Sequence, residues 1–124
     1  MRNRSLAIPG TLLISAIAVT DDVNKTISMY AKQPGDLLYV VGETHNELGG
    51  SHYYDLFGFL GNRLPQVNPK KAKLIFNALS EASSLGFIKA MHDCSEGGMA
   101  VALAEMAFSG GLGMEIFLSE VPFR

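Results

Sequence analysis

Two Gly-Gly pairs occupy equivalent places in the chain, each between an apolar run and a segment with helical spacing. Gly49-Gly50 follows the run at 37–41 and precedes the helical pattern at 51–60. Gly97-Gly98 follows the run at 87–91 and opens a second pattern at 98–108. Short apolar runs bounded by turn residues are typical of buried strands. The repeated order of strand, glycine turn and helix favours a fold that mixes helices and strands.

The clearest helix signals lie between the two glycine pairs. Asn68 followed by Pro69 is an N-cap and first-turn signature, and Gly86 supplies a stop. The apolar positions recur at helical intervals and are Ala72, Ile75, Leu79, Ala82 and Leu85. With two more strands predicted at 12–19 and 114–118, we expect an α+β fold in which helices pack on a mixed sheet.

The composition limits the class of protein. Of 124 residues, 48% are hydrophobic and 18% are charged, which excludes intrinsic disorder and fits one domain. The formal net charge of -2 gives no basic field for nucleic acid, and no apolar run is long enough to cross a membrane. Cys94 is the single cysteine and has no internal disulfide partner, so we expect a reducing, cytoplasmic location.

The first glycine loop, residues 42–54, reads GETHNELGGSHYY. Gly49 and Gly50 would let backbone N–H groups approach a ligand, and Ser51 at a helix start would bind an anion such as phosphate. The alternative is a tight turn with Ser51 as an ordinary N-cap. His45 and His52 lie within the same loop and would contact a ligand or make structural hydrogen bonds.

The second glycine loop opens the run HDCSEGGMAVALAEMAFSGG at 92–111. Asp93 and Glu96 would hold a divalent cation, because two carboxylates beside a phosphate repel it unless a metal bridges them. The alternative is that Asp93 or Ser95 caps the helix that follows. His92 would touch a ligand or make a structural hydrogen bond, and carboxylates on both sides of Cys94 disfavour a nucleophilic thiolate. We assign no catalytic residue.

The helix predicted at 98–108 is apolar nearly all round, and Glu105 is its only charged residue. The apolar side chains on its different faces are Met99, Val101, Leu103, Met106 and Phe108. Such a helix is normally covered on several sides. We therefore expect part of its surface to meet another domain or subunit, and the chain to self-associate.

Both glycine motifs, in this order, resemble the last domain of the phosphoribosylformylglycinamidine synthase family. The resemblance rests on the run from IPGTLLISAIAV through GETHNELGGSHYY and on HDCSEGGMAVALAEMA, and it extends from about residue 8 to 122. This family belongs to the aminoimidazole ribonucleotide synthetase-like superfamily, whose chains combine A-type and B-type domains. The resemblance implies the end of an A-type domain, or a linking strand, at 1–20. It also implies an incomplete B-type domain at 21–124, inactive on its own.

The resemblance further implies a ligase of purine biosynthesis that uses ATP and Mg²⁺. Formylglycinamide ribonucleotide is phosphorylated on its amide oxygen, and ammonia derived from glutamine then displaces the phosphate. The implied partners are the rest of the synthetase chain, a glutaminase subunit and a small accessory subunit, with no nucleic acid and no membrane.

Site residues follow from the resemblance only where the motifs match. Gly49, Gly50 and Ser51 would belong to a ligand-binding loop. Nucleotide-phosphate or metal residues would be Asp93, Ser95, Glu96, Gly97 and Gly98. Because the family duplicates its domains, we favour an auxiliary or interface role for this copy over the catalytic one.

Two alternatives stay open at this point. One is a stand-alone module that binds nucleotide or a partner without turnover. The other is a different ATP-dependent member of the superfamily, such as aminoimidazole ribonucleotide synthetase, selenophosphate synthetase or a hydrogenase maturation protein. The wording of the ELGGS and SEGG motifs argues against the second.

Overall fold

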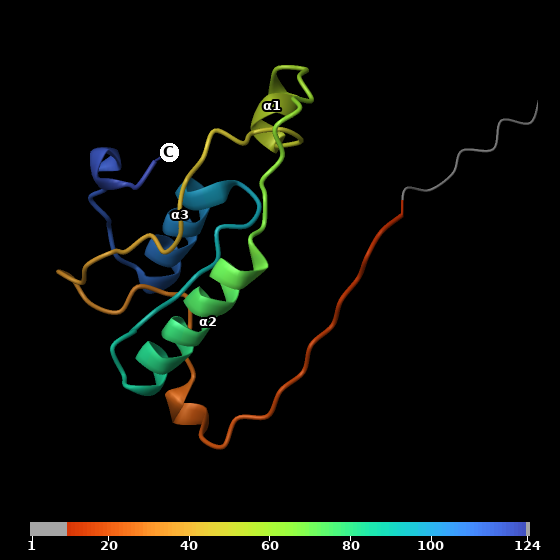
Figure 1. Ribbon diagram of the computed structural model, residues 1–124. Coiled ribbons are helices and arrows are strands. Elements are labelled where there is room, and N and C mark those ends of the chain that lie inside the picture. Colours follow the sequence, from red (N-terminus) through yellow and green to blue (C-terminus); the bar gives the residue numbers. More distant parts are fainter. Residues whose placement is uncertain (1–9, 124) are drawn as a thin grey trace, which may run out of the picture.

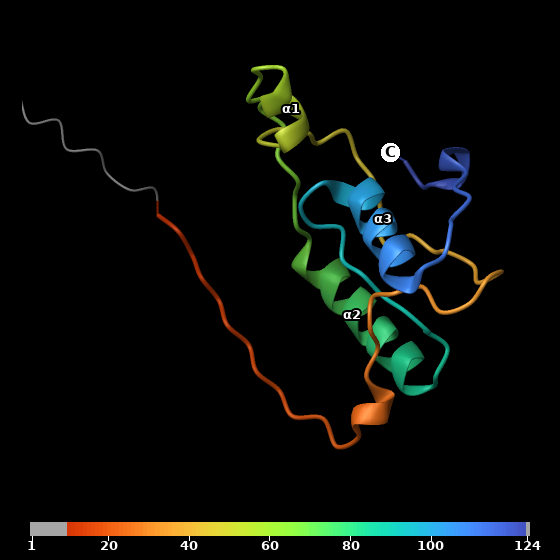
Figure 2. The same ribbon diagram turned by 180° about the vertical axis from the view of Figure 1, so that it is seen from behind.

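Helices are the regular elements of the computed structural model, which describes residues 10–123 (Figures 1 and 2). Within that range the α-helices are α1 (His52–Leu56), α2 (Pro69–Ser84) and α3 (Gly98–Gly110). Two short 3-10 helices lie at Val23–Lys25 and Leu118–Glu120. In the described range, no helix is both long and apolar enough to span a membrane.

Helix α2 confirms its sequence signals at both ends. The Asn68 side chain accepts a hydrogen bond of 3.1 Å from the Lys71 backbone N–H, and Pro69 begins the helix. The helix ends at Leu85 as C-cap, followed by Gly86 with φ of 74°. The predicted apolar stripe is the half-buried side of this helix and consists of Ala72, Ile75, Leu79 and Ala82, whereas Leu85 is exposed.

Helix α3 begins at Gly98, where the sequence predicts it. It contains Ala102, which is the only buried hydrophobic residue between 10 and 123. The Ala31 backbone N–H donates a 3.0 Å hydrogen bond to the Met106 carbonyl. A Cβ atom at Gly110 would lie 2.9 Å from the Ala31 backbone nitrogen and closer still to its carbonyl oxygen. The missing side chain of Gly110 therefore lets the chain at Ala31 reach the helix.

The predicted mixed sheet is not confirmed, because no strand forms among the described residues at 12–19, 37–41, 87–91 or 114–118. A strand needs a ladder of hydrogen bonds to a neighbouring strand. Among residues 10–123 one isolated bridge forms, which is parallel and joins Thr44 to Phe123, with the Thr44 N–H donating to the Pro122 carbonyl at 3.2 Å. The run at 87–91 makes one backbone hydrogen bond to the chain at Ser28, at 3.3 Å, and this single bond does not make a ladder.

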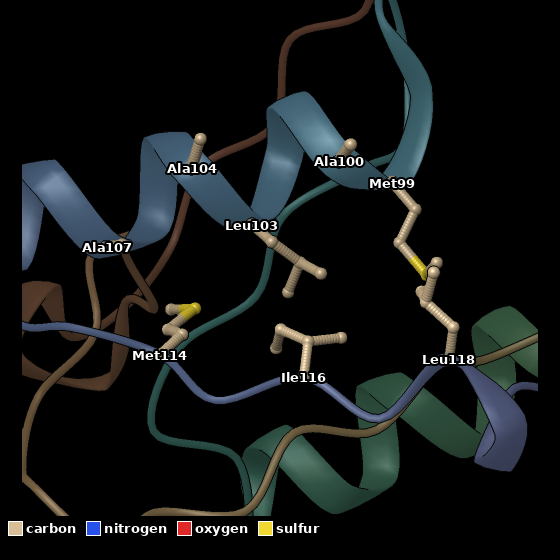
Figure 3. A pocket seen from close by; sticks show the side chains of 8 residues that line it. All are labelled: Met99, Ala100, Leu103, Ala104, Ala107, Met114, Ile116 and Leu118. Carbon is tan, nitrogen blue, oxygen red and sulfur yellow. The ribbon is translucent and has the colours of Figure 1, made fainter.

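The two-residue alternation that predicted strands nevertheless persists in side-chain exposure. Leu38 and Val40 are 42% and 40% exposed, whereas Leu37 and Tyr39 are 78% and 81% exposed. Met114, Ile116 and Leu118 likewise line one wall of an apolar groove of about 450 Å³ against α3 (Figure 3). The groove is completed by the α3 side chains Met99, Ala100, Leu103, Ala104 and Ala107.

Residues 10–20 extend away from the helices in both views (Figures 1 and 2). The large apolar side chains of this segment are exposed. They are Leu12, Leu13, Ile14, Ile17 and Val19. The predicted division at residue 20 into the end of one domain and the start of another stays a prediction. Residues 1–9 and 124 lie outside the described range.

Replacing Gly110 by Ala tests the close approach of Ala31 to α3. Ala is the better helix former by up to about 1 kcal/mol, so an unconstrained site would gain stability. We expect instead a loss of about 1–3 kcal/mol in the free energy of unfolding, because the new methyl group collides with backbone. Denaturant unfolding measures this change in the free energy of unfolding. Gly113→Ala is the control, because no atom lies within 4 Å of a Cβ atom placed at Gly113. A stabilised Gly110→Ala chain would contradict the packing.

The open apolar groove leads us to expect self-association of the chain. Sedimentation velocity at increasing concentration should show a growing dimer or oligomer fraction, because apolar surface left in water favours contact with another copy. Leu103→Ser, inside the groove, should reduce this association. Leu56→Ser is the matched control at an exposed position on α1. A clean monomer at high concentration would count against the expectation.

Candidate functional site

The first glycine loop folds against the segment that follows α1. The Gly49 N–H donates to the Arg63 carbonyl at 2.7 Å, and the Gly50 N–H donates to the Leu60 carbonyl at 2.7 Å. Both backbone donors that the sequence analysis offered to a ligand are thus used within the protein. The binding role predicted for Gly49 and Gly50 stays a prediction, and their observed role is to shape the loop.

Gly49 is buried and has no room for a side chain. A Cβ atom there would lie 2.6 Å from the Arg63 carbonyl oxygen and 2.8 Å from the Arg63 carbonyl carbon. This close contact forms one side of a small polar pocket of about 250 Å³. The pocket is lined by Asn46, Leu48, Gly49, Tyr54, Gly61, Asn62 and Arg63. The sequence analysis does not identify Arg63 as part of this site. Arg63 follows α1 in the sequence whereas the glycine pair precedes it, so no local pattern indicates their contact.

Ser51 is the N-cap of α1, as one of the two sequence interpretations has it. Its Oγ accepts a hydrogen bond of 3.2 Å from the Tyr54 N–H and donates one of 2.6 Å to the Leu48 carbonyl. The nearby histidines are not gathered around Ser51. His45 lies 3.5 Å from the Glu43 carboxylate, and His52 is exposed at the first position of α1.

The second glycine loop leads into α3 without a side-chain cap. Gly97 is the N-cap residue, in the left-handed conformation with φ of 82°, and no side chain bonds to the helix start. The Gly98 N–H instead donates to the Ser95 carbonyl at 3.1 Å. The interpretation of Asp93 or Ser95 as a helix cap is therefore wrong, because a glycine in a left-handed turn takes the cap position.

His92 connects this loop to α3 through two carboxylates. Its Nε2 lies 2.9 Å from Glu105 Oε2, and its Nδ1 lies 3.3 Å from Asp93 Oδ1. The His92 side chain is 13% exposed. Each ring nitrogen of His92 therefore faces a carboxylate oxygen. The sequence analysis does not predict the contact between Glu105 and His92. The signal for it is that Glu105 is the single charged residue on an otherwise apolar helix.

Asp93 and Glu96 both lie on the exposed side of the loop. The Asp93 side chain is 82% exposed, and the pKa of its carboxyl group is lowered. The main cause is a hydrogen bond from the backbone N–H of Asp93 itself, followed by the contact with His92. Asp93 is thus ionised at neutral pH. Cys94 between them is free and exposed.

No three His, Cys, Asp or Glu side chains gather as a complete metal site between residues 10 and 123. Mg²⁺ usually keeps several waters and uses one or two carboxylates together with substrate phosphates. The metal role predicted for Asp93 and Glu96 stays a prediction. In the described chain no hydrogen bond or ion pair joins Gly49, Gly50 or Ser51 to residues 93–98.

The features of the chain are matched by a known family. The model for "AIR synthase related protein, C-terminal domain" matches residues 33–124, and the chain belongs to this family. The match confirms the predicted AIR synthase-related C-terminal domain, whereas the predicted mixed sheet is not confirmed, since the described residues contain no strand.

Its curated relatives include the phosphoribosylformylglycinamidine synthase subunit PurL of several organisms, which confirms the resemblance seen in the two motifs. The chain is 38% identical to the subunit of Moorella thermoacetica over 91% of its length. It is 36% identical to the subunit of Thermobifida fusca over 96% of the chain, and 45% identical to the subunit of Thermococcus kodakarensis over 75% of the chain. The chain spans only 16%, 16% and 13% of the lengths of these three relatives, respectively. No solved structure matches the chain.

The lowered pKa of Asp93 gives a pH prediction. A carboxyl group with a depressed pKa in the folded state stabilises that state above its unfolded pKa. This stabilisation is lost as the pH falls through the folded-state pKa. We expect a carbon-detected NMR titration of the Asp93 carboxyl group to give a midpoint below the ordinary value of 3.8. A midpoint at or above that value would show that the backbone and His92 hydrogen bonds are absent in solution.

Proposed function

We propose that this chain forms part of a phosphoribosylformylglycinamidine synthase. The activity would convert formylglycinamide ribonucleotide, ATP and an amide nitrogen from glutamine to formylglycinamidine ribonucleotide, ADP and phosphate. The observation that carries the proposal is the similarity to PurL subunits over 75–96% of the chain, at 36–45% identity. Because the chain spans about one sixth of those subunits, it would contribute one surface of the nucleotide or substrate cleft and would be inactive alone.

In this proposal the second loop faces the nucleotide. Asp93 and Glu96 would hold Mg²⁺, with Ser95, Gly97 and Gly98 beside the phosphates. Mg²⁺ bound there would offset the negative charge of the phosphates. The exposure and the ionised state of Asp93 support the metal role.

The first loop would shape the adjoining polar pocket. Gly49, Gly50 and Ser51 fix its wall through their contacts with Arg63, Leu60 and Leu48. Arg63 is among the residues that line the pocket, and guanidinium groups suit phosphate and carboxylate partners. This pocket is therefore our candidate contact for an anionic group of the ligand.

The proposed setting is a cytoplasmic complex. The relatives are named as a subunit, and we propose a glutaminase subunit, a small accessory subunit and the rest of the synthetase chain as partners. An auxiliary or interface nucleotide site suits a loop at which no three His, Cys, Asp or Glu side chains gather among residues 10–123.

A chimera tests the assignment of the enzyme. Residues 8–124 would replace the matching segment of the Moorella thermoacetica subunit, and formation of formylglycinamidine ribonucleotide would be measured with ATP, Mg²⁺ and ammonia. We expect turnover by the chimera and none by the 124-residue chain. A folded chimera that binds nucleotide without turnover would instead favour the stand-alone binding module.

Charge-removing variants of the two carboxylates test the metal role. In the chimera, Asp93→Asn and Glu96→Gln should each weaken ATP binding by about tenfold with Mg²⁺ present and by much less without it. The reason is that each carboxylate acts on the nucleotide through the metal. Glu115→Gln removes one exposed charge elsewhere and serves as the control. An equal effect with and without Mg²⁺ would remove the metal from the proposal.

A further inference from the structure

The contacts of His92 with Glu105 and Asp93 connect the best-packed helix to an exposed carboxylate. Glu105 lies within α3, whose backbone is fixed by its own hydrogen bonds and by Ala31. His92 is largely covered, so its ring has little freedom to rotate away from Glu105. Asp93 is the next residue along the chain and lies at the open edge of the loop.

We propose that Glu105 and His92 are positioning residues for Asp93. Glu105 fixes the imidazole ring through Nε2, and Nδ1 of the same ring fixes Asp93 Oδ1, so that the remaining carboxylate oxygen is presented to a divalent cation. The inference rests on the proposed function, because that function gives Asp93 a cation to hold.

A structural role alone accounts for only one of the two contacts. The bond between His92 Nε2 and Glu105, at 2.9 Å, is enough to attach the loop to α3. The second contact reaches a side chain that is 82% exposed, where an ion pair adds little stability because water competes for both groups. What that contact changes is the orientation of Asp93. Residues that orient a metal ligand in this way typically alter metal affinity by ten-fold or more when they are replaced.

Two substitutions at His92 separate attachment from positioning. The Gln side-chain nitrogen stands close to the place of Nε2, so His92→Gln keeps a donor for Glu105 and removes the one for Asp93. The Asn nitrogen stands close to the place of Nδ1, so His92→Asn does the reverse. Glu105→Gln removes the charge that holds the ring while keeping the size of the side chain, and Glu115→Gln is the control.

The first readout is the Asp93 side-chain rotamer, measured in the 124-residue chain by three-bond NMR couplings about χ1. We expect one rotamer in the unaltered chain and in Glu115→Gln, and averaging in His92→Gln and Glu105→Gln. Circular dichroism checks that α3 is retained in each variant. An Asp93 side chain that already averages in the unaltered chain, or stays fixed in His92→Gln, overturns the positioning role.

The second readout is Mn²⁺ binding in the presence of ATP, followed by the electron paramagnetic resonance signal of free Mn²⁺. We expect His92→Gln and Glu105→Gln to weaken binding by about tenfold, Asp93→Asn to weaken it at least as much, and His92→Asn to have an intermediate effect. Unchanged affinity in His92→Gln contradicts the proposal.

The two readouts also separate this inference from the proposed function. If Asp93→Asn leaves Mn²⁺ binding unchanged, the metal role of Asp93 is wrong, and the couplings alone then decide whether His92 positions the carboxylate. If Asp93→Asn abolishes binding while His92→Gln does not, the metal role stands and the positioning role is wrong.

Discussion

The 3.0 Å hydrogen bond from the Ala31 N–H to the Met106 carbonyl ties the chain ahead of the first loop to α3. It is possible only because Gly110 has no side chain. Close by along the chain, the Met91 N–H donates to the Ser28 carbonyl at 3.3 Å, and the next residue, His92, reaches Glu105. Segments from both halves of the sequence therefore share one helix as their common support, in place of the ladder that a sheet would provide.

The two glycine loops differ in how they are attached to α3. The second loop is attached to α3 at both ends, through His92 on one side and through the helix start at Gly97 on the other. In the first loop, the Gly49-Gly50 turn is held by α1 and by the carbonyls of Leu60 and Arg63, all within twenty residues. The same Gly-Gly sequence thus builds a self-contained turn in one place and the entrance to a central helix in the other.

Local signals account for what the sequence predicted correctly. Asn68, Pro69 and Gly86 define α2 because caps, first turns and stops depend on neighbouring residues only. Ser51 is an N-cap for the same reason, because its side chain bonds to the nearby Tyr54 N–H. The predicted strands do not form, because strand formation depends on partners remote in the sequence, although the run at 37–41 keeps its two-residue alternation of exposure. The links of Glu105 to His92 and of Arg63 to Gly49 are also non-local, and for this reason they became visible only in the structure.

The single bridge between Thr44 and Phe123 has a consequence for the order of folding. It joins residues nearly eighty positions apart, and closing a flexible loop of that length costs about 4 kcal/mol in chain entropy. One backbone hydrogen bond contributes a net stabilisation of only about 1 kcal/mol. The bridge therefore forms after α3 and its attached segments have already brought the two ends together, and it opens first. The Thr44 amide should accordingly exchange its hydrogen with solvent faster than the amides in the middle of α3.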